Sequence, residues 1–281
     1  MQIGIRALDD SLNLQKNKKP LIHCISNPIY VEDLEKSIIR YNGNPMFSTS
    51  LDKYTEVTSK ANSLLISLDN LNDSKVDEIE KSIRIARRKG IPVVLDILGI
   101  NISFLRKEIA LRFINRYDIN VVTGKLEEFK VLVLKKDKLE KETSSNYKLR
   151  EDEALRFSLR KFSKIYSTIV AVKCDDYYLT DGFSEFYINR DINKENKLLE
   201  IEAILSGLIS VGIAAASNTE ERFIGVLVAI MAMAVSEKIA EQKSLVYMKD
   251  IILKEYLLDE IININSDKLS KLAKVDYLFI R

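Results

Sequence analysis

Several side chains that can bind an anion, a metal ion or a proton stand at the ends of short apolar segments. They are Asn27, Asp69, Asp96, Thr123 and Lys173, together with the aromatic residue Phe47. Ligands of open α/β sheets sit at the carboxyl ends of parallel strands. If these segments are such strands, their ends lie along one edge of the sheet, and the sequence predicts a binding or catalytic site there.

Two glutamates add an unusual charge pattern. Residues 198–217 read LLEIEAILSGLISVGIAAAS, so Glu200 and Glu202 lead into a small-residue apolar run with helical spacing. The first amides of a helix lack backbone partners and carry partial positive charge, which makes a helix start a natural phosphate site. Carboxylates placed there repel a phosphate. Lys173 is able to serve a nucleotide phosphate as a point charge. An ion pair with Glu200 or Glu202 explains the unusual charges together, and we predict that pair.

His23 is the single histidine of the chain, and an imidazole is an obvious candidate for a general base. Its neighbours Ile22 and Cys24 are typical of a packed strand, and adjacent strand residues point to opposite faces, which argues against a Cys–His nucleophilic pair. Cys174 would be reactive if Lys173 lowered its pKa. We predict structural roles for His23 and both cysteines.

The elements that must position these residues alternate in type along the chain. Apolar strands are predicted at residues 20–26, 44–48, 63–69, 91–96, 119–122 and 169–174. Amphipathic helices are predicted at residues 31–40, 74–89, 103–116, from 126 onward and at 152–164. This rhythm is typical of a three-layer α/β fold with a central, mostly parallel sheet flanked by helices.

The rest of the chain completes a mixed sheet and a helical region. YYLTDG and FSEFYI are predicted to form a hairpin with Asp181 and Gly182 at the turn, which adds antiparallel strands at one edge. Helices are predicted at residues 201–217, 221–241 and 246–262. The lysine-rich stretch 135–148 is interleaved with acids, and we interpret it as a charged insertion within one domain that covers residues 1–281.

Composition excludes several classes of partner. Forty-three basic and 41 acidic residues give a net charge of +2 without a clustered basic face, so we expect no nucleic-acid partner. The apolar run at residues 223–235 is shorter than the roughly 20 residues of a membrane span. The start of the chain has no secretory pattern, and the two cysteines lie far apart, so we expect a soluble, cytoplasmic protein. Neither a dinucleotide fingerprint nor a Walker loop is present.

The segment PLIHCISN at residues 20–27, followed by a helix and NPMFS, resembles the opening of hydroxyethylthiazole kinases. Those enzymes phosphorylate a thiazole alcohol in thiamine salvage on a ribokinase-like fold. The resemblance extends to GIPVVLDILG at 90–99, TGKLEEF at 123–129 and VAVKCDDYYLTDG at 170–182. It covers roughly residues 20–217 in order and spacing, and it implies a ribokinase-like fold for this chain.

The resemblance also implies roles for individual positions. Substrate would meet Asn27, Phe47 and Glu200, nucleotide would meet Thr123 and Lys173, and Mg²⁺ would be held by Asp96 and Glu128. Mg²⁺ commonly takes one or two carboxylates together with phosphate oxygens. An aspartate at a strand end is equally common as a turn or capping residue, so both interpretations of Asp96 remain open.

The phosphate-binding run departs most from the family pattern. In the family, a Gly-Thr-Gly-Cys run at a helix start binds the transferred phosphoryl group through its amides, and its cysteine lies beside the reacting hydroxyl. This chain has Glu200-Ile201-Glu202-Ala203 there, and Ala203 has no proton-accepting atom. Phosphoryl transfer relies on positioning and on positive charge around the transferred group. No catalytic residue therefore remains intact at this position.

Two functions are compatible with this pattern. The first is a relative with lost or much reduced ATP-dependent phosphorylation of the thiazole alcohol, kept for a bound thiazole-like ligand or for assembly. The alternative is an active hydroxyethylthiazole kinase that uses Mg-ATP in a rearranged site. Family members are trimers with sites at subunit junctions, which implies a homotrimer or a hetero-oligomer with an active paralogue. ATP and Mg²⁺ would be cofactors only if the protein is an active kinase.

Restoring the family run tests whether the phosphate site has been lost through these four residues. Replacing Glu200-Ile201-Glu202-Ala203 by Gly-Thr-Gly-Cys removes two carboxylates from a helix start, so we expect the affinity for ATP to rise. Equilibrium binding of ATP to the two purified chains measures the change. Unchanged affinity would mean that the surrounding pocket has collapsed, or that the alignment at this loop is displaced.

Overall fold

The computed structural model describes residues 4–48, 50–69, 71–134, 148–192, 201–247 and 250–278. Two sequence-based predictions therefore lie outside the described residues. They are the charged insertion, apart from its last residue Lys148, and the position of Glu200.

The described residues form one nine-stranded sheet in the order β2-β1-β3-β4-β5-β6-β7-β8-β9. The strands are β1 Leu21–Ile25, β2 Asn44–Phe47, β3 Ser63–Ser67, β4 Val93–Asp96, β5 Val121–Lys125, β6 Ile169–Lys173, β7 Tyr177–Thr180, β8 Glu185–Ile188 and β9 Val275–Leu278. Strands β1 to β6 pair in parallel, and β7, β8 and β9 are antiparallel. The predicted mostly parallel, mixed sheet is confirmed.

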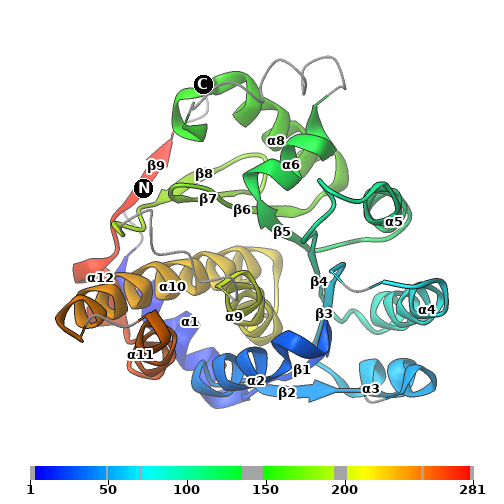
Figure 1. Cartoon of the computed structure of the whole chain (residues 1–281), viewed down its shortest axis with the longest axis horizontal. Coiled ribbons are helices and arrows are strands. Elements are labelled where there is room, and N and C mark those ends of the chain that lie inside the picture. The colour runs from blue at the N-terminus through cyan, green and yellow to red at the C-terminus, as the bar shows by residue number, and fades with distance from the viewer. Residues whose placement is uncertain are drawn as a thin grey trace.

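Helices cover both faces of this sheet, as Figure 1 shows. One face carries α1 Ile5–Lys18, α2 Val31–Arg40, α9 Ile201–Ala215, α10 Thr219–Tyr247, α11 Asp250–Ile262 and α12 Ser266–Leu272. The other carries α3 Tyr54–Lys60, α4 Asp73–Lys89, α5 Phe104–Arg116, α6 Leu126–Val133 and α8 Glu153–Tyr166. Short 3₁₀ turns are η1 Pro28–Tyr30, η2 Leu51–Lys53 and η3 Leu149–Glu151. The result is the three-layer α/β architecture predicted from the sequence.

Each strand serves two hydrophobic cores because its side chains alternate between the faces. In β3, Leu65 packs with the helices around α9, whereas Leu64 and Ile66 pack with α4 and its neighbours. All five residues of β3 are buried. A strand covered on both faces is apolar throughout rather than at every second position, which is the pattern of buried parallel sheets.

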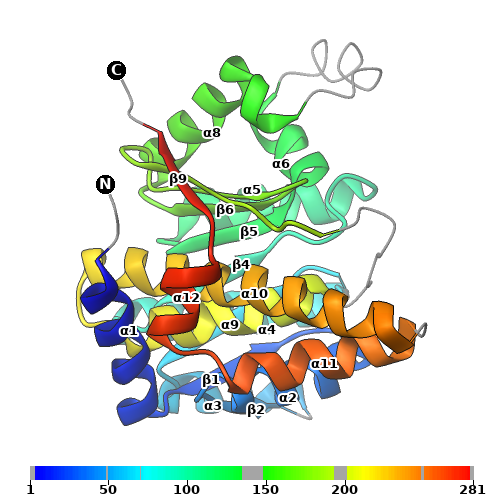
Figure 2. The same cartoon turned by 90° about the vertical axis from the view of Figure 1, so that its left-hand side faces the viewer.

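Helix α10 is the central helix of one layer. Its residues Thr219–Ser244 are long and apolar enough to cross a membrane by composition, but 78% of the most apolar window is buried inside the protein. Figure 2 shows α10 lying among α1, α11 and α12. An all-round apolar helix is typical of a core surrounded by other helices, and burial here accounts for the apolar run at residues 223–235.

Several parts of the fold differ from the sequence-based expectation. Helices α1, α3 and α12 and strand β9 were not predicted, and α10 ends at Tyr247 rather than at Glu241. The predicted helix at 246–262 corresponds to α11, which begins at Asp250. The predicted turn at Asp181 and Gly182 is confirmed: Gly182 has a φ of +87°, which favours glycine.

A glycine contact fixes how α9 lies against α10. A Cβ atom on Gly212 would lie 2.4 Å from the carbonyl oxygen of Gly225, and one on Gly225 would lie 2.5 Å from that of Gly212. The two backbones therefore touch, and no side chain fits between them. Because α9 also contacts β3 and β4, this contact helps to set where the start of α9 lies over the sheet.

Replacing Gly212 by alanine tests this backbone contact. The added methyl group meets backbone rather than a flexible side chain, so we expect the free energy of unfolding to fall by about 1–3 kcal/mol, the usual cost of overpacking. Urea denaturation measures the change. Gly4→Ala is the matched control, because nothing lies within 4 Å of a Cβ at that position. Equal stability of the two variants would contradict the contact.

Candidate functional site

The ends of three neighbouring parallel strands and the first turn of α9 form the candidate site. In the sheet register Asp96 of β4 lies opposite Thr123 of β5, and Lys125 of β5 lies opposite Lys173 of β6. The sheet thus places two lysines side by side on adjacent strands. Like charges in this arrangement repel each other, so the site needs a compensating negative charge.

Glu202, in the first turn of α9, supplies that charge. Its Oε1 atom lies 2.5 Å from Nζ of Lys173 and 3.3 Å from Nζ of Lys125. The predicted ion pair between Lys173 and an acid of this helix is therefore confirmed, with Glu202 as the partner. The second lysine that contacts Glu202, Lys125, was not predicted.

The pair between Lys173 and Glu202 is largely removed from water. The exposed fraction of the side chain is 13% for Lys173 and 8% for Glu202, against 40% for Lys125. Burial lowers the pKa of Lys173, and the Glu202 carboxylate opposes that change. Removing one partner of such a pair leaves a buried charge without compensation, which costs far more than the pair contributes.

Asp96 lies at the end of β4 with 3% of its surface exposed. Its Oδ1 accepts a hydrogen bond from the amide of Leu98 at 3.1 Å, and its Oδ2 accepts one from the Ser206 hydroxyl at 3.0 Å. Burial raises the pKa of Asp96 well above its ordinary value, and the charge of nearby Glu128 raises it further. The hydrogen bond to Leu98 fits the turn-residue interpretation, and burial is the larger cause of the raised pKa.

Glu128 belongs to α6 and is 2% exposed. One carboxylate oxygen accepts from the amide of Gly99 at 2.6 Å and the other from the amide of Lys125 at 2.7 Å. Burial raises its pKa, and the two amides oppose the change. Glu128 therefore ties the loop after β4 to the start of α6, which is a structural task independent of any metal.

Asp96 and Glu128 remain chemically suitable for Mg²⁺. Each carboxylate oxygen accepts one hydrogen bond and keeps a further lone pair, since such an oxygen has two. Within the described part of the chain, no group of three or more acidic, histidine or cysteine side chains is placed to hold a metal ion. The two carboxylates fit a Mg²⁺ ion that takes its remaining ligands from water and nucleotide phosphates.

The other predicted site residues are spread along the sheet. Asn27 follows β1, and its side chain accepts from the amide of Ile29 at 3.2 Å, so it caps η1. Phe47 ends β2 opposite Cys24 and packs against the core. Strands β3 and β4 separate these two residues from Thr123, which is 3% exposed. Ala203 is buried in the first turns of α9.

His23 has the structural role predicted for it. It is fully buried, and its ring nitrogens lie 2.8 Å from the Thr58 hydroxyl and 3.1 Å from the Ser48 hydroxyl. Burial lowers the pKa of His23 to about 4, so the ring is neutral near pH 7. Burial also raises the pKa of the Cys174 thiol to about 12, which argues against a reactive thiolate.

Two residues of the site were missed at the sequence level, and each leaves a recognisable signal. Lys125 becomes visible once β5 and β6 are aligned as parallel strands, because it then lies opposite Lys173. Ser206 lies four residues after Glu202, on the same side of α9, and its hydroxyl reaches both Asp96 and the Glu202 carbonyl oxygen at 2.9 Å. The strand pairing would therefore have revealed Lys125, and the helical period would have revealed Ser206.

A second buried ion pair lies near Lys173. Arg190 donates to the Glu237 carboxylate of α10 at 2.7 and 3.0 Å, and the Tyr177 hydroxyl donates to the same carboxylate at 3.0 Å. The charge of Arg190 contributes to the lowered pKa of Lys173. These contacts join the antiparallel strands to α10 and explain why Glu237 is buried within an apolar helix.

The arrangement of sheet and helices is that of ribokinase-like kinases. A solved hydroxyethylthiazole kinase protein from Pyrococcus horikoshii OT3 aligns over 97% of this chain and 99% of its own, with a TM-score of 0.83 at 18% identity. The Bacillus subtilis pyridoxal kinase, solved as an ADP complex, aligns over 78% of this chain and 91% of its own, with a TM-score of 0.56 at 13% identity. At identities of 18% and 13%, these solved structures establish the fold alone.

The family is established by the sequence itself. The pattern of the hydroxyethylthiazole kinase family matches residues 12–267, and the chain belongs to that family. The hydroxyethylthiazole kinase of Clostridium perfringens is 28% identical over 271 residues, which is 95% of this chain and 100% of the relative. Hydroxyethylthiazole kinase 2 of Clostridium botulinum is 37% identical over 117 residues, 42% of this chain and 44% of the relative.

The raised pKa of Asp96 predicts how stability depends on pH. A carboxyl whose folded pKa exceeds its ordinary value of 3.8 contributes stability below that value and loses it as the pH rises through the folded pKa. Asp96→Asn removes this titration. We therefore expect the free energy of unfolding of the variant to rise relative to that of the parent as the pH rises from about 4 to 7. Urea denaturation at each pH measures both values.

Asp118→Asn controls for the loss of one negative charge, because the Asp118 side chain is 76% exposed. If the two variants differ from the parent by the same amount at every pH, the buried-carboxyl account of Asp96 is wrong.

Proposed function

We propose that this member of the hydroxyethylthiazole kinase family phosphorylates the thiazole alcohol slowly or not at all. In this proposal the protein is retained for binding a thiazole-like ligand or for assembly. The family relationship supplies the reaction class and its place in thiamine salvage, and the loss of rate is our inference. We further propose that the protein acts in the cytoplasm.

A single observation carries the proposal: the Glu202 carboxylate contacts both Lys173 and Lys125 at the start of α9. A transferred phosphoryl group needs donors and positive charge aimed at it. Here both cations already face a carboxylate, and a phosphate placed nearby meets a like charge at close range. At an effective dielectric constant near 20, such a repulsion amounts to a few kcal/mol at about 4 Å.

The residue after Glu202 supports the same proposal. Ala203 falls where the resemblance places the family cysteine beside the reacting hydroxyl, and alanine can neither accept nor donate a proton there. Asp96 and Glu128 would still hold Mg²⁺ if nucleotide phosphates brought it in. Positioning alone provides much of the rate in enzymes, so slow turnover with Mg-ATP is the specific alternative that these two carboxylates favour.

Substrate and partners follow the family in this proposal. Asn27 and Phe47, near the β1–β2 edge of the sheet, would contact the thiazole-like ligand, and Glu200 falls at a third substrate position. Thr123 and Lys173 occupy the positions that would meet nucleotide. The assembly would be a homotrimer, or a hetero-oligomer in which an active paralogue contributes the phosphoryl-transfer residues.

Turnover measurements separate the two functions. We expect the chain, given Mg-ATP and hydroxyethylthiazole, to release ADP at least about 100-fold more slowly than the C. perfringens relative assayed beside it, the cost of losing one preorganised donor group. We also expect no rate above that of the Asp96→Asn variant, and no shift of the unfolding temperature by ATP. ADP release and thermal unfolding are the two measurements.

The alternative makes the opposite prediction. An active kinase with a rearranged site would release ADP well above its Asp96→Asn and Asp96→Ala variants, and ATP with Mg²⁺ would stabilise it against heat. Finding both would overturn the proposed loss of activity. Thermal shift by the thiazole alcohol without ADP release would support the ligand-binding role.

A further inference from the structure

Asp69 is a strand-end acid that the candidate site leaves without a role. It comes two residues after β3, and the amide of its neighbour Leu68 donates to the Asp96 carbonyl oxygen at 3.1 Å. Strand β3 lies between β1 and β4 in the sheet. Along the edge where ligands of open sheets bind, Asp69 therefore stands between Asn27, proposed to contact substrate, and Asp96.

The carboxylate of Asp69 lacks a hydrogen-bond partner. Both of its oxygens are buried, and neither accepts a hydrogen bond within the described ranges. The backbone of the same residue is engaged, because the Arg106 guanidinium donates to its carbonyl oxygen. A buried carboxylate without a partner has lost the hydrogen bonds that it makes in water, which is strongly unfavourable. A bound group with N–H donors would restore them.

Charged neighbours are close to Asp69, yet none satisfies it. Burial and the charge of Glu128 raise the pKa of Asp96, and the charge of Asp69 raises it further. Burial lowers the pKa of Lys75, and the charge of Asp69 opposes that change. Lys75 is therefore within electrostatic range, but it bonds to neither oxygen of Asp69. The carboxylate remains able to bind a positively charged N–H group.

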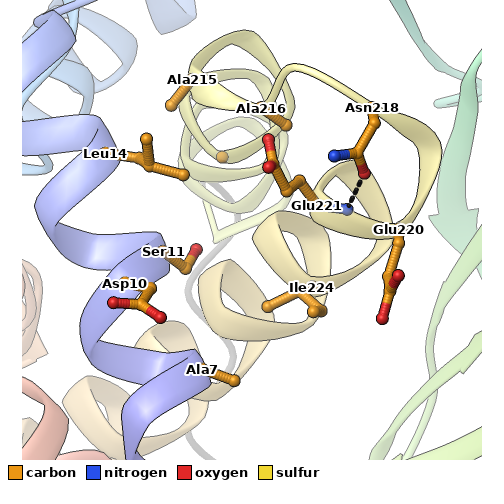
Figure 3. Close-up of a pocket in the computed structure, with 11 residues that line it drawn as sticks. Ala7, Asp10, Ser11, Leu14, Ala215, Ala216, Asn218, Glu220, Glu221 and Ile224 are labelled. Carbon is orange, nitrogen blue, oxygen red and sulfur yellow. Dashed lines mark hydrogen bonds between the residues drawn. The ribbon is translucent and has the colours of Figure 1, made fainter.

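The groove in the helical layer offers no comparable group. Figure 3 shows this space of about 270 Å³ between α1, the end of α9 and the start of α10. Its carboxylates are exposed, as at Asp10 and Glu220, or engaged, as at Glu221, which accepts from the Ser217 amide at 2.6 Å. Among the side chains that line it, none has a buried polar atom without a partner. The unpartnered acid thus points to the strand ends.

Two unpartnered oxygens in one carboxylate select the shape of the donor. A hydroxyl has one O–H donor and satisfies one oxygen at most. An amino group beside a protonated ring nitrogen presents two parallel N–H groups, which match both oxygens as an arginine guanidinium does. Hydroxyethylthiazole cannot make this contact, because its ring nitrogen accepts hydrogen bonds and its hydroxyl is its single donor.

We propose that the ligand of this protein is a cyclic amidine, a nitrogen heterocycle with an amino group beside a protonated ring nitrogen, and that Asp69 accepts both of its N–H groups. This inference rests on the ligand-binding role proposed above, and it narrows the thiazole-like ligand to an amino-substituted ring. Both oxygens are covered, so the ligand reaches them once a neighbouring side chain moves. Arg106, which contacts the Asp69 backbone, is long enough to make way.

Isothermal titration calorimetry on the full chain, without nucleotide, tests the proposal with three alcohols of similar shape. They are hydroxyethylthiazole, its derivative with an amino group on the ring carbon between sulfur and nitrogen, and its N-methylated thiazolium. We expect the amino derivative to bind about 10- to 100-fold more tightly than hydroxyethylthiazole, the range of one charge-assisted hydrogen-bonded contact. The thiazolium has a positive charge but no N–H donor, so it should bind less tightly than the amino derivative.

Matched variants locate the preference. Asp69→Asn removes the charge and one acceptor at nearly constant shape, so the preference for the amino derivative over hydroxyethylthiazole should disappear. Asp118→Asn makes the same change at a side chain that is 76% exposed, and it should keep the parent preference. Unfolding temperatures check that each variant is folded. If Asp69→Asn does not fold, the comparison of the three ligands on the parent chain decides.

The outcomes separate this inference from the proposed function. Equal affinities of the parent for the amino derivative and hydroxyethylthiazole, an equally tight thiazolium, or an unchanged preference in Asp69→Asn would each overturn the role of Asp69. The ligand-binding role would then stand if hydroxyethylthiazole itself binds. Absence of binding by all three alcohols would overturn both. ADP release bears on the loss of phosphoryl transfer alone and does not enter this test.

Discussion

One carboxylate shared by two lysines holds the strand ends of this protein in their observed arrangement. Lys125 and Lys173 face each other across adjacent parallel strands, in the register that also pairs Val121 with Ile169 and Gly124 with Val172. The repulsion between the lysines is therefore built into the sheet. Glu202 reaches both ammonium groups from α9, so the helix start and the sheet are joined by charge as well as by packing.

The same contact balances the charges at the strand ends within the protein itself. In a kinase of this architecture, positive charge at the strand ends would face a ligand that leaves after each turnover. Here Glu202 provides the opposite charge permanently. Buried ion pairs add little net stability, but the loss of either partner lowers the free energy of unfolding strongly. Mutation of one member alone would therefore destabilise the fold. Asp96 and Glu128 persist with hydrogen bonds that also serve the local backbone.

The central part of the fold was predictable because its strands and helices show clear periods of two and 3.6 residues. Helix α1 was not, because two of its three buried residues are the polar Ser11 and Gln15, which weaken its apolar pattern. Strand β9 is four residues long and only half buried. Of the site, the pairing of Lys173 followed from charge alone. Lys125 required the strand register.

Helix α1 also bears on how the chain folds. Its residues contact α9, α10 and α12, and Asp9 accepts a hydrogen bond from Ser266 near the other end of the chain. Such contacts close very long loops, which slows their formation. During synthesis the first helix is complete long before its partners leave the ribosome. Its buried residues then stay exposed until α9, α10 and α12 have formed.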